Sequence, residues 1–285
     1  ERSERFAFDT ETSSLDALTA DLVGISLAVE PGEAYYIPVG HTIGEQLGKN
    51  RVLEVFKKYL ASDKLKIAHN LKFDLTVCGT LGLSLEPPYF DTMIAAYLLQ
   101  PGSRSFSLAE LAFSEFTEEM QPISELIGKG KSEQSFTEVA IDEAAPYAGH
   151  DADVTLRLYE AFRPRLESEG LEEIAFSVEL PLVPILAAME RRGIRIDSKY
   201  LGKLGEELRV EIERLEKHIC KLAGCDFNIA SPAQLAEVLY ERLGLGGSNI
   251  KRGKTGYSTA ASELEKLRGS HPIIDEITSY RELVK

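Results

Sequence analysis

Alternating apolar and polar residues dominate the start of the chain, and this pattern predicts β-strands. The segment RFAFDTET at 5–12 alternates, DLVGISLAVE follows at 21–30, and AYYIPVG at 34–40 forms a third short run. A Pro-Gly-Glu turn at 31–33 separates the second run from the third. Runs this close together along the chain predict an antiparallel meander.

Helical periodicity follows the meander. Apolar residues recur at helical spacing over roughly 45–61, 71–82, 91–99, 107–114 and 142–166, and a short apolar strand is expected at 66–68. Asn70 is expected to be the N-cap of the second of these helices. A sheet that opens with a meander and then alternates with helices predicts an α/β fold.

The composition changes near residues 170–180, and helical patterns dominate from there on. Leu and Ile recur every three or four residues over 201–222, which predicts a long helix. Ser231-Pro-Ala-Gln reads as a capping box with proline at the first helical position, so a helix is expected to begin at Pro232. The length of 285 residues also favours two domains, which we place at 1–172 and 173–285.

Composition and charge narrow the class of protein. The net charge is −14, yet residues 1–174 carry 15 basic and 30 acidic side chains, whereas residues 175–285 carry 17 and 16. Acidity does not exclude a nucleic-acid partner, because carboxylates that hold divalent cations reverse the local field. No apolar run approaches the ~20 residues of a membrane-spanning helix, so no membrane partner is expected. Cys78, Cys220 and Cys225 lack metal or disulfide spacing, which favours a reducing, cytoplasmic compartment.

Three short motifs carry the candidate chemistry. Asp9 and Glu11 stand two apart in a predicted strand, so their carboxylates share one face. Asp74 lies in the first turn of the helix after the strand at 66–68. Tyr147 and Asp151 are four apart in a predicted helix and also share a face. Each motif alone is common in proteins without any such function, as a solvated strand end or helix face.

The three motifs together are far more specific than any one of them. Four carboxylates and one phenol arrive in a fixed order on a strand, a helix start and a helix. Oxygen ligands without thiolates favour Mg²⁺ or Mn²⁺. A pair of such ions is the usual apparatus of phosphodiester hydrolysis. The sequence therefore predicts a two-metal site.

In these motifs the chain resembles the large fragment of bacterial DNA polymerase I, a family A polymerase. Residues 1–170 are similar to the 3′→5′ proofreading exonuclease, an RNase H-like fold of the DEDDy class with a mixed sheet and flanking helices. The segments GCDFNIASPAQL, LYERLGL, KTGYST and YRELVK are similar to the start of the polymerase part and its thumb, a mainly α-helical segment. The resemblance covers essentially the whole chain.

The resemblance implies roles for individual residues. Asp9, Glu11 and Asp151 would hold the first Mg²⁺ or Mn²⁺ ion, and Asp9 with Asp74 the second. Tyr147 and Glu11 would orient the attacking water. These five residues are the expected catalytic set.

The resemblance also implies contacts with DNA. The positions expected to hold the terminal nucleotide of a single-stranded 3′ end are Thr12, Leu15, Asn70 and Ile123. Ile123 departs from the family, which carries an aromatic residue there. The positions expected to contact the backbone of duplex DNA at the thumb are Lys251, Arg252 and Lys254.

We therefore expect a monomeric, metal-dependent 3′→5′ exonuclease that releases 5′-mononucleotides from DNA. The palm and fingers of the family follow the YREL segment, so this chain is expected to lack a polymerase active site and to be a fragment or truncated product. Two alternatives stay open. An RNase D-like enzyme would use the same chemistry on the 3′ end of RNA, and a DNA-binding module would not catalyse at all.

Overall fold

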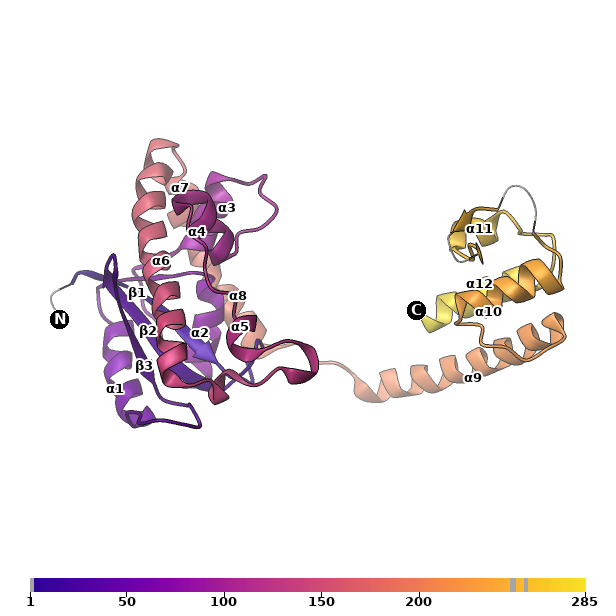
Figure 1. Cartoon of the computed structure of the whole chain (residues 1–285), viewed down its shortest axis with the longest axis horizontal. Coiled ribbons are helices and arrows are strands. Elements are labelled where there is room, and N and C mark those ends of the chain that lie inside the picture. Colours follow the sequence, from indigo (N-terminus) through magenta and orange to yellow (C-terminus); the bar gives the residue numbers. More distant parts are fainter. Residues whose placement is uncertain (1–2, 247–249, 254–255) are drawn as a thin grey trace. The chain divides into compact units, whose positions relative to one another are not determined.

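A computed structural model describes residues 3–246, 250–253 and 256–285 (Figure 1). The chain forms two compact units, of which the first ends at Gly193 and the second begins at Ile194. Residues 173–193 belong to the first unit, because helix α8 (Leu180–Arg192) packs on helix α2 (Leu71–Thr80). The functional division at residue 172 stays a prediction. None of the helices in the described part of the chain is both long and apolar enough to cross a bilayer.

A mixed five-stranded sheet forms the middle of the first unit, with the strand order β3-β2-β1-β4-β5. Its strands are β1 (Arg5–Thr12), β2 (Leu22–Glu30), β3 (Glu33–Pro38), β4 (Leu65–Ala68) and β5 (Tyr89–Asp91). The antiparallel pairing of β1 with β2 and of β2 with β3 confirms the expected meander. β4 and β5 add parallel strands on the other side of β1. β5 was not expected from the sequence, because three residues are too few to show a period.

Helices cover both faces of this sheet (Figure 1). They are α1 (Lys49–Leu60), α2, α3 (Thr92–Leu99), α4 (Leu108–Phe116), α5 (Ser124–Ile127), α6 (Ile141–Ser168), α7 (Glu172–Ile174) and α8, with 3-10 turns at Gly130–Ser132 and Phe136–Glu138 and a π-helical segment at Ala175–Glu179. The expected helices all form, with ends a few residues from those predicted. The long helix α6 packs across β1, β2 and β3.

The alternation along β1 sends successive side chains into two different cores. Phe6 and Phe8 lie in the core that α1 and α2 cover, and Phe8 stacks edge-on against Phe56 of α1. Ala7 lies in the opposite core, with Ala152 and other residues of α6. Residues that follow Ala7 at intervals of two therefore face α6, and this register decides where the acidic residues of β1 point.

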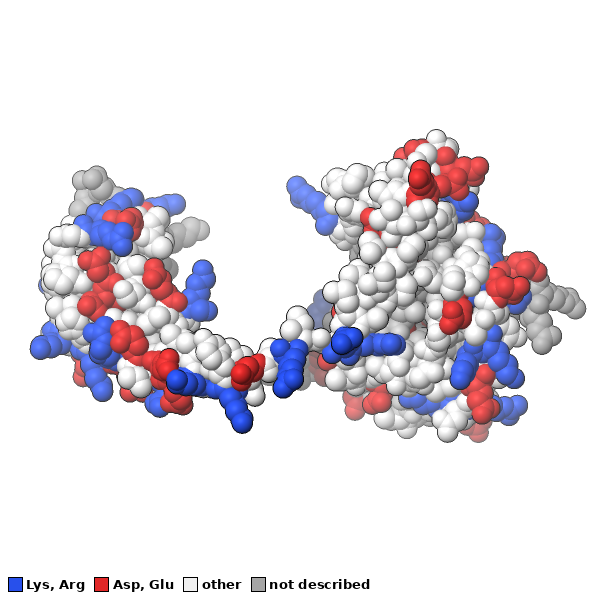
Figure 2. Space-filling view, turned by 180° about the vertical axis from the view of Figure 1, so that it is seen from behind, with Lys and Arg blue, Asp and Glu red and all other residues white. Residues whose placement is uncertain are grey.

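The second unit is mainly helical. Its elements are α9 (Ser198–Ala223), α10 (Pro232–Ala236), a π-helical segment at Glu237–Arg242, a ribbon of β6 (Arg252–Gly253) and β7 (Gly256–Tyr257), α11 (Ala261–Glu265) and α12 (Ile273–Val284). Lys, Arg, Asp and Glu side chains are interspersed on the face that Figure 2 shows. This mixture agrees with the near-neutral charge of residues 175–285.

Two details of the second unit differ from the sequence interpretation. Leu215 and Ile219 of α9 are buried in the core of the unit, but Leu201 is 49% exposed, so only the later part of the apolar seam at 201–222 packs there. The helix at Pro232 begins as expected, and the Ser231 hydroxyl accepts the N–H of Gln234 (3.5 Å). The second half of the capping box does not form, because Gln234 Oε1 accepts the N–H of Asn228 instead (2.7 Å).

Candidate active site

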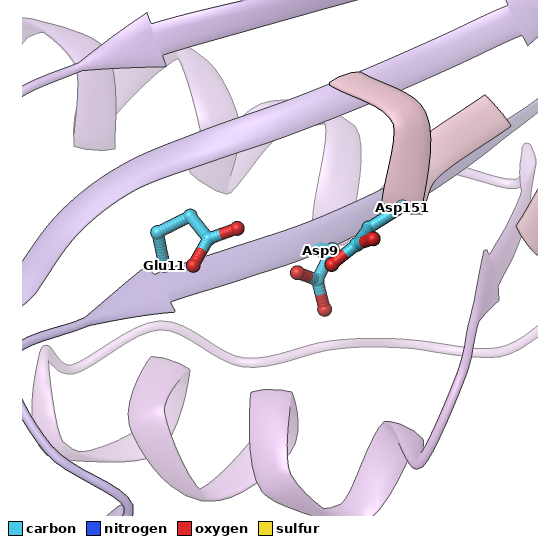
Figure 3. A group of neighbouring side chains, drawn as sticks. All are labelled: Asp9, Glu11 and Asp151. Atoms are coloured by element: carbon cyan, nitrogen blue, oxygen red, sulfur yellow. The ribbon is translucent and has the colours of Figure 1, made fainter. Parts of the chain in front are cut away.

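The acidic residues of β1 and α6 meet on one face of the sheet. Asp9 and Glu11 follow Ala7 at intervals of two and therefore face α6, which carries Asp151. Oxygen atoms of these three carboxylates all lie within 4.8 Å of one another. Figure 3 shows Asp9 and Asp151 turned toward each other, with Glu11 further along the strand that carries Asp9. The strand register and the course of α6 thus build the predicted cluster.

Asp74 approaches β1 from the other side of the sheet. β4 pairs with β1 only as far as Ala7, so the N–H groups further along this edge of β1 are free of the ladder. The chain turns from β4 into α2, and Asp74 Oδ1 accepts both the N–H (3.1 Å) and the hydroxyl (2.6 Å) of Thr10. Thr10 stands between Asp9 and Glu11 in the sequence. Asp74 is therefore held close to Asp9, the carboxylate with which it was expected to hold the second ion.

Burial and mutual repulsion make these carboxylates weak acids. Burial raises the pKa of Asp9 from its ordinary 3.8 to about 6. The pKa of Glu11 is raised well above its usual range by burial and then by the charges of Asp9 and Asp151. Burial, followed by the charge of Asp9, does the same to the pKa values of Asp74 and Asp151. Four like charges in one buried place are unfavourable unless a cation compensates them.

Tyr147 lies one helical turn before Asp151 on α6. Burial, and then the neighbouring negative charges of Asp151 and Glu11, raise the pKa of the Tyr147 phenol, so it keeps its proton at neutral pH. A hydrogen bond from the phenol lowers the pKa of Asp151 and partly offsets the effect of burial. The ring packs near Phe136 at a centroid distance of 6.1 Å. Tyr147 can therefore present a hydrogen-bonding hydroxyl beside the carboxylates.

The positions expected to hold a nucleotide are only partly brought together. Leu15 and Asn70 line one pocket of about 380 Å³, together with Lys72 and Phe73 of α2. Leu15 is 93% exposed, so its side chain is available to a ligand. Thr12 and Ile123 are absent from the lining of this pocket as the structure describes it. The Thr12 hydroxyl donates to the carbonyl of Ser14 (2.8 Å), and Ile123, which is 40% exposed, is the N-cap of the short helix α5.

Comparison with known proteins decides the family. Residues 1–167, more than half of the chain, match the family model described as 3′-5′ exonuclease. The chain belongs to the 3′-5′ exonuclease family. Residues 198–285 match the family model described as DNA polymerase family A. The resemblance inferred from the short motifs is thereby confirmed.

Individual relatives of this member of the 3′-5′ exonuclease family are DNA polymerase I proteins. DNA polymerase I of Chloroflexus aurantiacus is 43% identical over 98% of this chain, and that of Pseudomonas aeruginosa is 38% identical over 94%. The chain spans 30% of the length of each of these relatives. A solved structure titled as the POL domain of Pol1 from M. smegmatis in complex with DNA primer-template and dNTP is 25% identical. It aligns with a TM-score of 0.74 over 99% of this chain and 45% of its own. The expected fold, a mixed sheet with flanking helices and then a mainly helical segment, is confirmed.

The carboxylates of this exonuclease fit a divalent cation. Oxygen ligands at about 2.0–2.6 Å from one ion lie less than about 5 Å apart, which agrees with the 4.8 Å limit on the Asp9, Glu11 and Asp151 oxygens. Glu11 Oε1 is buried and has no hydrogen-bond partner among the residues that the structure describes. An oxygen without a donor among three negative charges has its natural partner in a metal ion. The donor set is all oxygen, as Mg²⁺ and Mn²⁺ prefer.

The raised pKa of Asp9 predicts how the stability of the metal-free exonuclease depends on pH. Between pH 3.8 and about 6 the folded state binds this proton more strongly than the unfolded state. The free energy of unfolding therefore falls as the pH rises through this window, by up to about 3 kcal/mol from Asp9 alone, and the loss is complete by about pH 7.

Urea unfolding in EDTA measures this effect by comparing wild type with Asp9→Asn at pH 4.5 and 7.5. The variant carries no titrating group at this position, so we expect it to gain stability relative to wild type at the higher pH. A difference between the two proteins that is the same at both pH values would show that Asp9 is not destabilised by its surroundings.

Asp91 shapes the exonuclease site at the start of α2, and the sequence did not predict this role. Asn70 stands at the N-cap of α2 as expected, with a left-handed backbone (φ 61°), but its side chain makes no capping hydrogen bond. The buried carboxylate of Asp91, at the end of β5, accepts the N–H groups of Asn70 and Leu71 instead. The sequence Asp91-Thr92 before an apolar helix is a recognisable N-cap signal for α3. No pattern of neighbouring residues predicts that the same carboxylate also caps α2.

The basic residues expected at the thumb lie in the second unit. Lys251 and Arg252 are exposed, and Lys254 lies outside the described residues. The N–H of Lys251 donates to Glu263 Oε2 (2.9 Å), and the Arg252 guanidinium lies 5.0 Å from the ring centroid of Tyr257. Both contacts leave the Lys251 ammonium and much of the Arg252 side chain at the surface.

Proposed function

We propose that this chain hydrolyses DNA from its 3′ end and releases 5′-mononucleotides, with two divalent cations as cofactors. The observation that carries the proposal is the convergence of Asp9, Glu11 and Asp151, in which Glu11 Oε1 is buried and has no hydrogen-bond partner within the described part of the chain. Asp74 lies beside this cluster on Thr10. A cluster of this kind is costly to a fold and is typical of metal-dependent phosphodiesterases.

The residues divide between two cations. Asp9, Glu11 and Asp151 would hold one ion, and Asp9 with Asp74 the other. When bound, such ions lower the pKa of water and stabilise negative charge on the leaving oxygen. Mg²⁺ and Mn²⁺ both suit the all-oxygen donor set.

Tyr147 and Glu11 would place the attacking water. The protonated phenol of Tyr147 offers a hydroxyl beside Asp151, and the Glu11 carboxylate lies in the same cluster and can accept a hydrogen bond from the water. A water held between them can attack phosphorus in line with the bond to the 3′ oxygen. The new P–O bond forms as the P–O3′ bond breaks, the water proton leaves to solvent, and the 3′ oxygen takes a proton from solvent. The product is a 5′-mononucleotide.

DNA is favoured over RNA as the substrate. Residues 198–285 match the DNA polymerase family A model, and the related M. smegmatis structure is titled as a complex with a DNA primer-template. The pocket that Leu15 and Asn70 line offers a place for a terminal nucleotide that is splayed away from its partner strand. Because the relatives are bacterial DNA polymerases, we further propose that the chain acts in the cytoplasm.

The experiment that tests this function uses the full chain and 5′-labelled oligonucleotides with Mg²⁺. We expect a ladder that shortens from the 3′ end, faster on a mismatched terminus than on a blunt paired one, since part of the unstacking cost is already met. EDTA should stop the reaction. Faster cleavage of RNA of the same sequence would favour the RNase D-like alternative, and DNA binding without any cleavage would favour the non-catalytic module.

We also propose that the basic segment at Lys251 and Arg252 in the second unit contacts the backbone of duplex DNA. Each phosphate contact releases counterions, so Lys251→Ala/Arg252→Ala should weaken duplex binding similarly on all sequences. In a plot of the logarithm of the binding constant against the logarithm of the salt concentration, the slope should also become less steep by roughly one unit per lost contact. Lys217→Ala/Lys221→Ala removes the same charge from exposed positions of α9 and is the control. Equal effects of the two double variants on the salt dependence would show that overall charge, rather than the segment at Lys251 and Arg252, governs binding.

A further inference from the structure

Asp91 accepts four backbone hydrogen bonds, two from each of two helices. Oδ1 accepts the N–H groups of Asn70 (3.2 Å), Met93 (2.8 Å) and Ile94 (3.3 Å), and Oδ2 accepts that of Leu71 (2.8 Å). The side chain is 2% exposed. Burial raises the pKa of Asp91 to about 6 while the four donors oppose that rise, so the group is ionised at neutral pH. It stands at the N-termini of both α2 and α3, where the helix dipoles favour a negative charge.

The bonds to α2 hold a backbone in an uncommon conformation. Asn70 has φ 61° and ψ 48°, a left-handed geometry that glycine adopts freely and that asparagine adopts more readily than most other residues with a side chain. The Asn70 side chain supplies no cap of its own. The Asp91 carboxylate caps the start of α2 in its place and ties it to the end of β5. The neighbouring Thr92 hydroxyl adds bonds to Ala68 and His69, which precede the helix.

The start of α2 decides where Asp74 lies. Asp74 is three residues after Leu71, within the first turn of the helix, and its carboxylate reaches Thr10 of β1 only if that turn is fixed. A carboxylate 1 Å out of place loses most of its value as a metal ligand, since ligand distances to Mg²⁺ vary little. The position of Asp74 therefore depends on a residue that does not itself face the site.

We propose that Asp91 is a positioning residue of the nuclease site, which fixes the first turn of α2 and thereby sets the affinity of the Asp74 side of the site for a divalent cation. The inference rests on the proposed function, in which Asp74 holds one of two ions. A purely structural cap would lower the stability of the fold and leave cation binding unchanged.

Asp91→Asn in the full chain tests the proposal. The amide keeps the size of the side chain but turns an NH₂ group toward at least one of the four N–H donors. We expect Mn²⁺, titrated calorimetrically without DNA, to bind the weaker of its sites about 10–100-fold less tightly, as is usual when the group that orients a ligand is lost. Amide hydrogen exchange over 70–74 in the metal-free protein should become faster than in wild type.

Two further variants separate positioning from general destabilisation. Ser107→Ala removes the hydroxyl that caps α4, a helix without any site residue, and should leave Mn²⁺ binding unchanged. Asn70→Gly accepts the left-handed backbone without strain, so adding it to Asp91→Asn should recover part of the lost affinity. If Asp91→Asn alone does not fold, comparing Asn70→Gly with Asn70→Gly/Asp91→Asn makes the same measurement.

The outcomes distinguish this proposal from the proposed function. Wild-type Mn²⁺ affinity in Asp91→Asn, or unchanged exchange over 70–74, would overturn the positioning role even if the chain is an active nuclease. A wild-type chain that binds Mn²⁺ but cleaves no DNA would overturn the proposed function, while a loss of Mn²⁺ affinity in Asp91→Asn would still support the positioning of Asp74.

Discussion

Replacing Asp9 with alanine is expected to lower the rate of DNA hydrolysis by about 10³-fold or more. Asp9 is the one carboxylate assigned to both cations, so its loss weakens the whole metal site. A bound metal contributes several kcal/mol to stabilising the transition state, and each 1.36 kcal/mol is a factor of about ten in rate. Single-turnover hydrolysis of a labelled single strand at saturating Mg²⁺ measures the effect.

The fold of the Asp9→Ala variant should survive, because the change relieves repulsion among buried carboxylates. Asp153→Ala is the matched control from α6. Asp153 binds the N–H of Gly32 (2.6 Å) and Arg157 (3.3 Å), away from the carboxylate cluster, and its loss should change the rate less than about threefold. An Asp9→Ala variant that keeps more than about a tenth of the wild-type rate is incompatible with the two-metal assignment.

Tyr147→Phe is expected to lower the rate by about 10²-fold, less than the loss of a metal ligand. The substitution removes the hydroxyl and keeps the ring that packs near Phe136. Groups that position or activate a reacting water contribute on the order of 10²–10⁴ in rate. The Mg²⁺ concentration for half-maximal rate should stay close to that of wild type, because Tyr147 is assigned to water rather than to the ions.

Tyr36→Phe provides the control for this second prediction. Tyr36 packs against the same buried cluster as Tyr147, but its hydroxyl pairs with His41 Nε2 (2.7 Å). We expect its loss to affect stability more than turnover. A Tyr147→Phe variant that is fully active, or as inactive as Asp9→Ala, would show that the phenol does not have the orienting role assigned to it.

Local patterns were enough to predict most elements of the first unit. The alternation at 5–12 and the helical spacing at 142–166 are properties of neighbouring residues, and β1 and α6 formed where those patterns lie. The three-residue strand β5 and the two-residue strands of the ribbon escaped prediction. Strands of that length are defined by the partner they pair with, and their own sequence is too short to specify them.

The candidate catalytic residues were also predicted from the sequence. Asp9 with Glu11 and Tyr147 with Asp151 each share a face for local reasons, a period of two in a strand and one turn of a helix. Their convergence is a property of the fold, because it depends on α6 crossing the face of the sheet to which Ala7 belongs. The distances among the carboxylates, and the raised pKa values that follow from burial, exist only in the folded chain.

The sequence by itself thus determined which chemical groups this exonuclease carries and which of them share an element. Only the tertiary structure decided which elements contact one another, and the hydrogen bonds of Asp91 show why. Its capping of α3 involves only residues 91–94, whereas its bonds to Asn70 and Leu71 span some twenty residues of sequence. They form because the pairing of Ala68 with Asp91 places the ends of β4 and β5 side by side. A hydrogen bond of this kind depends on the position of a distant backbone, which no local pattern of side chains encodes.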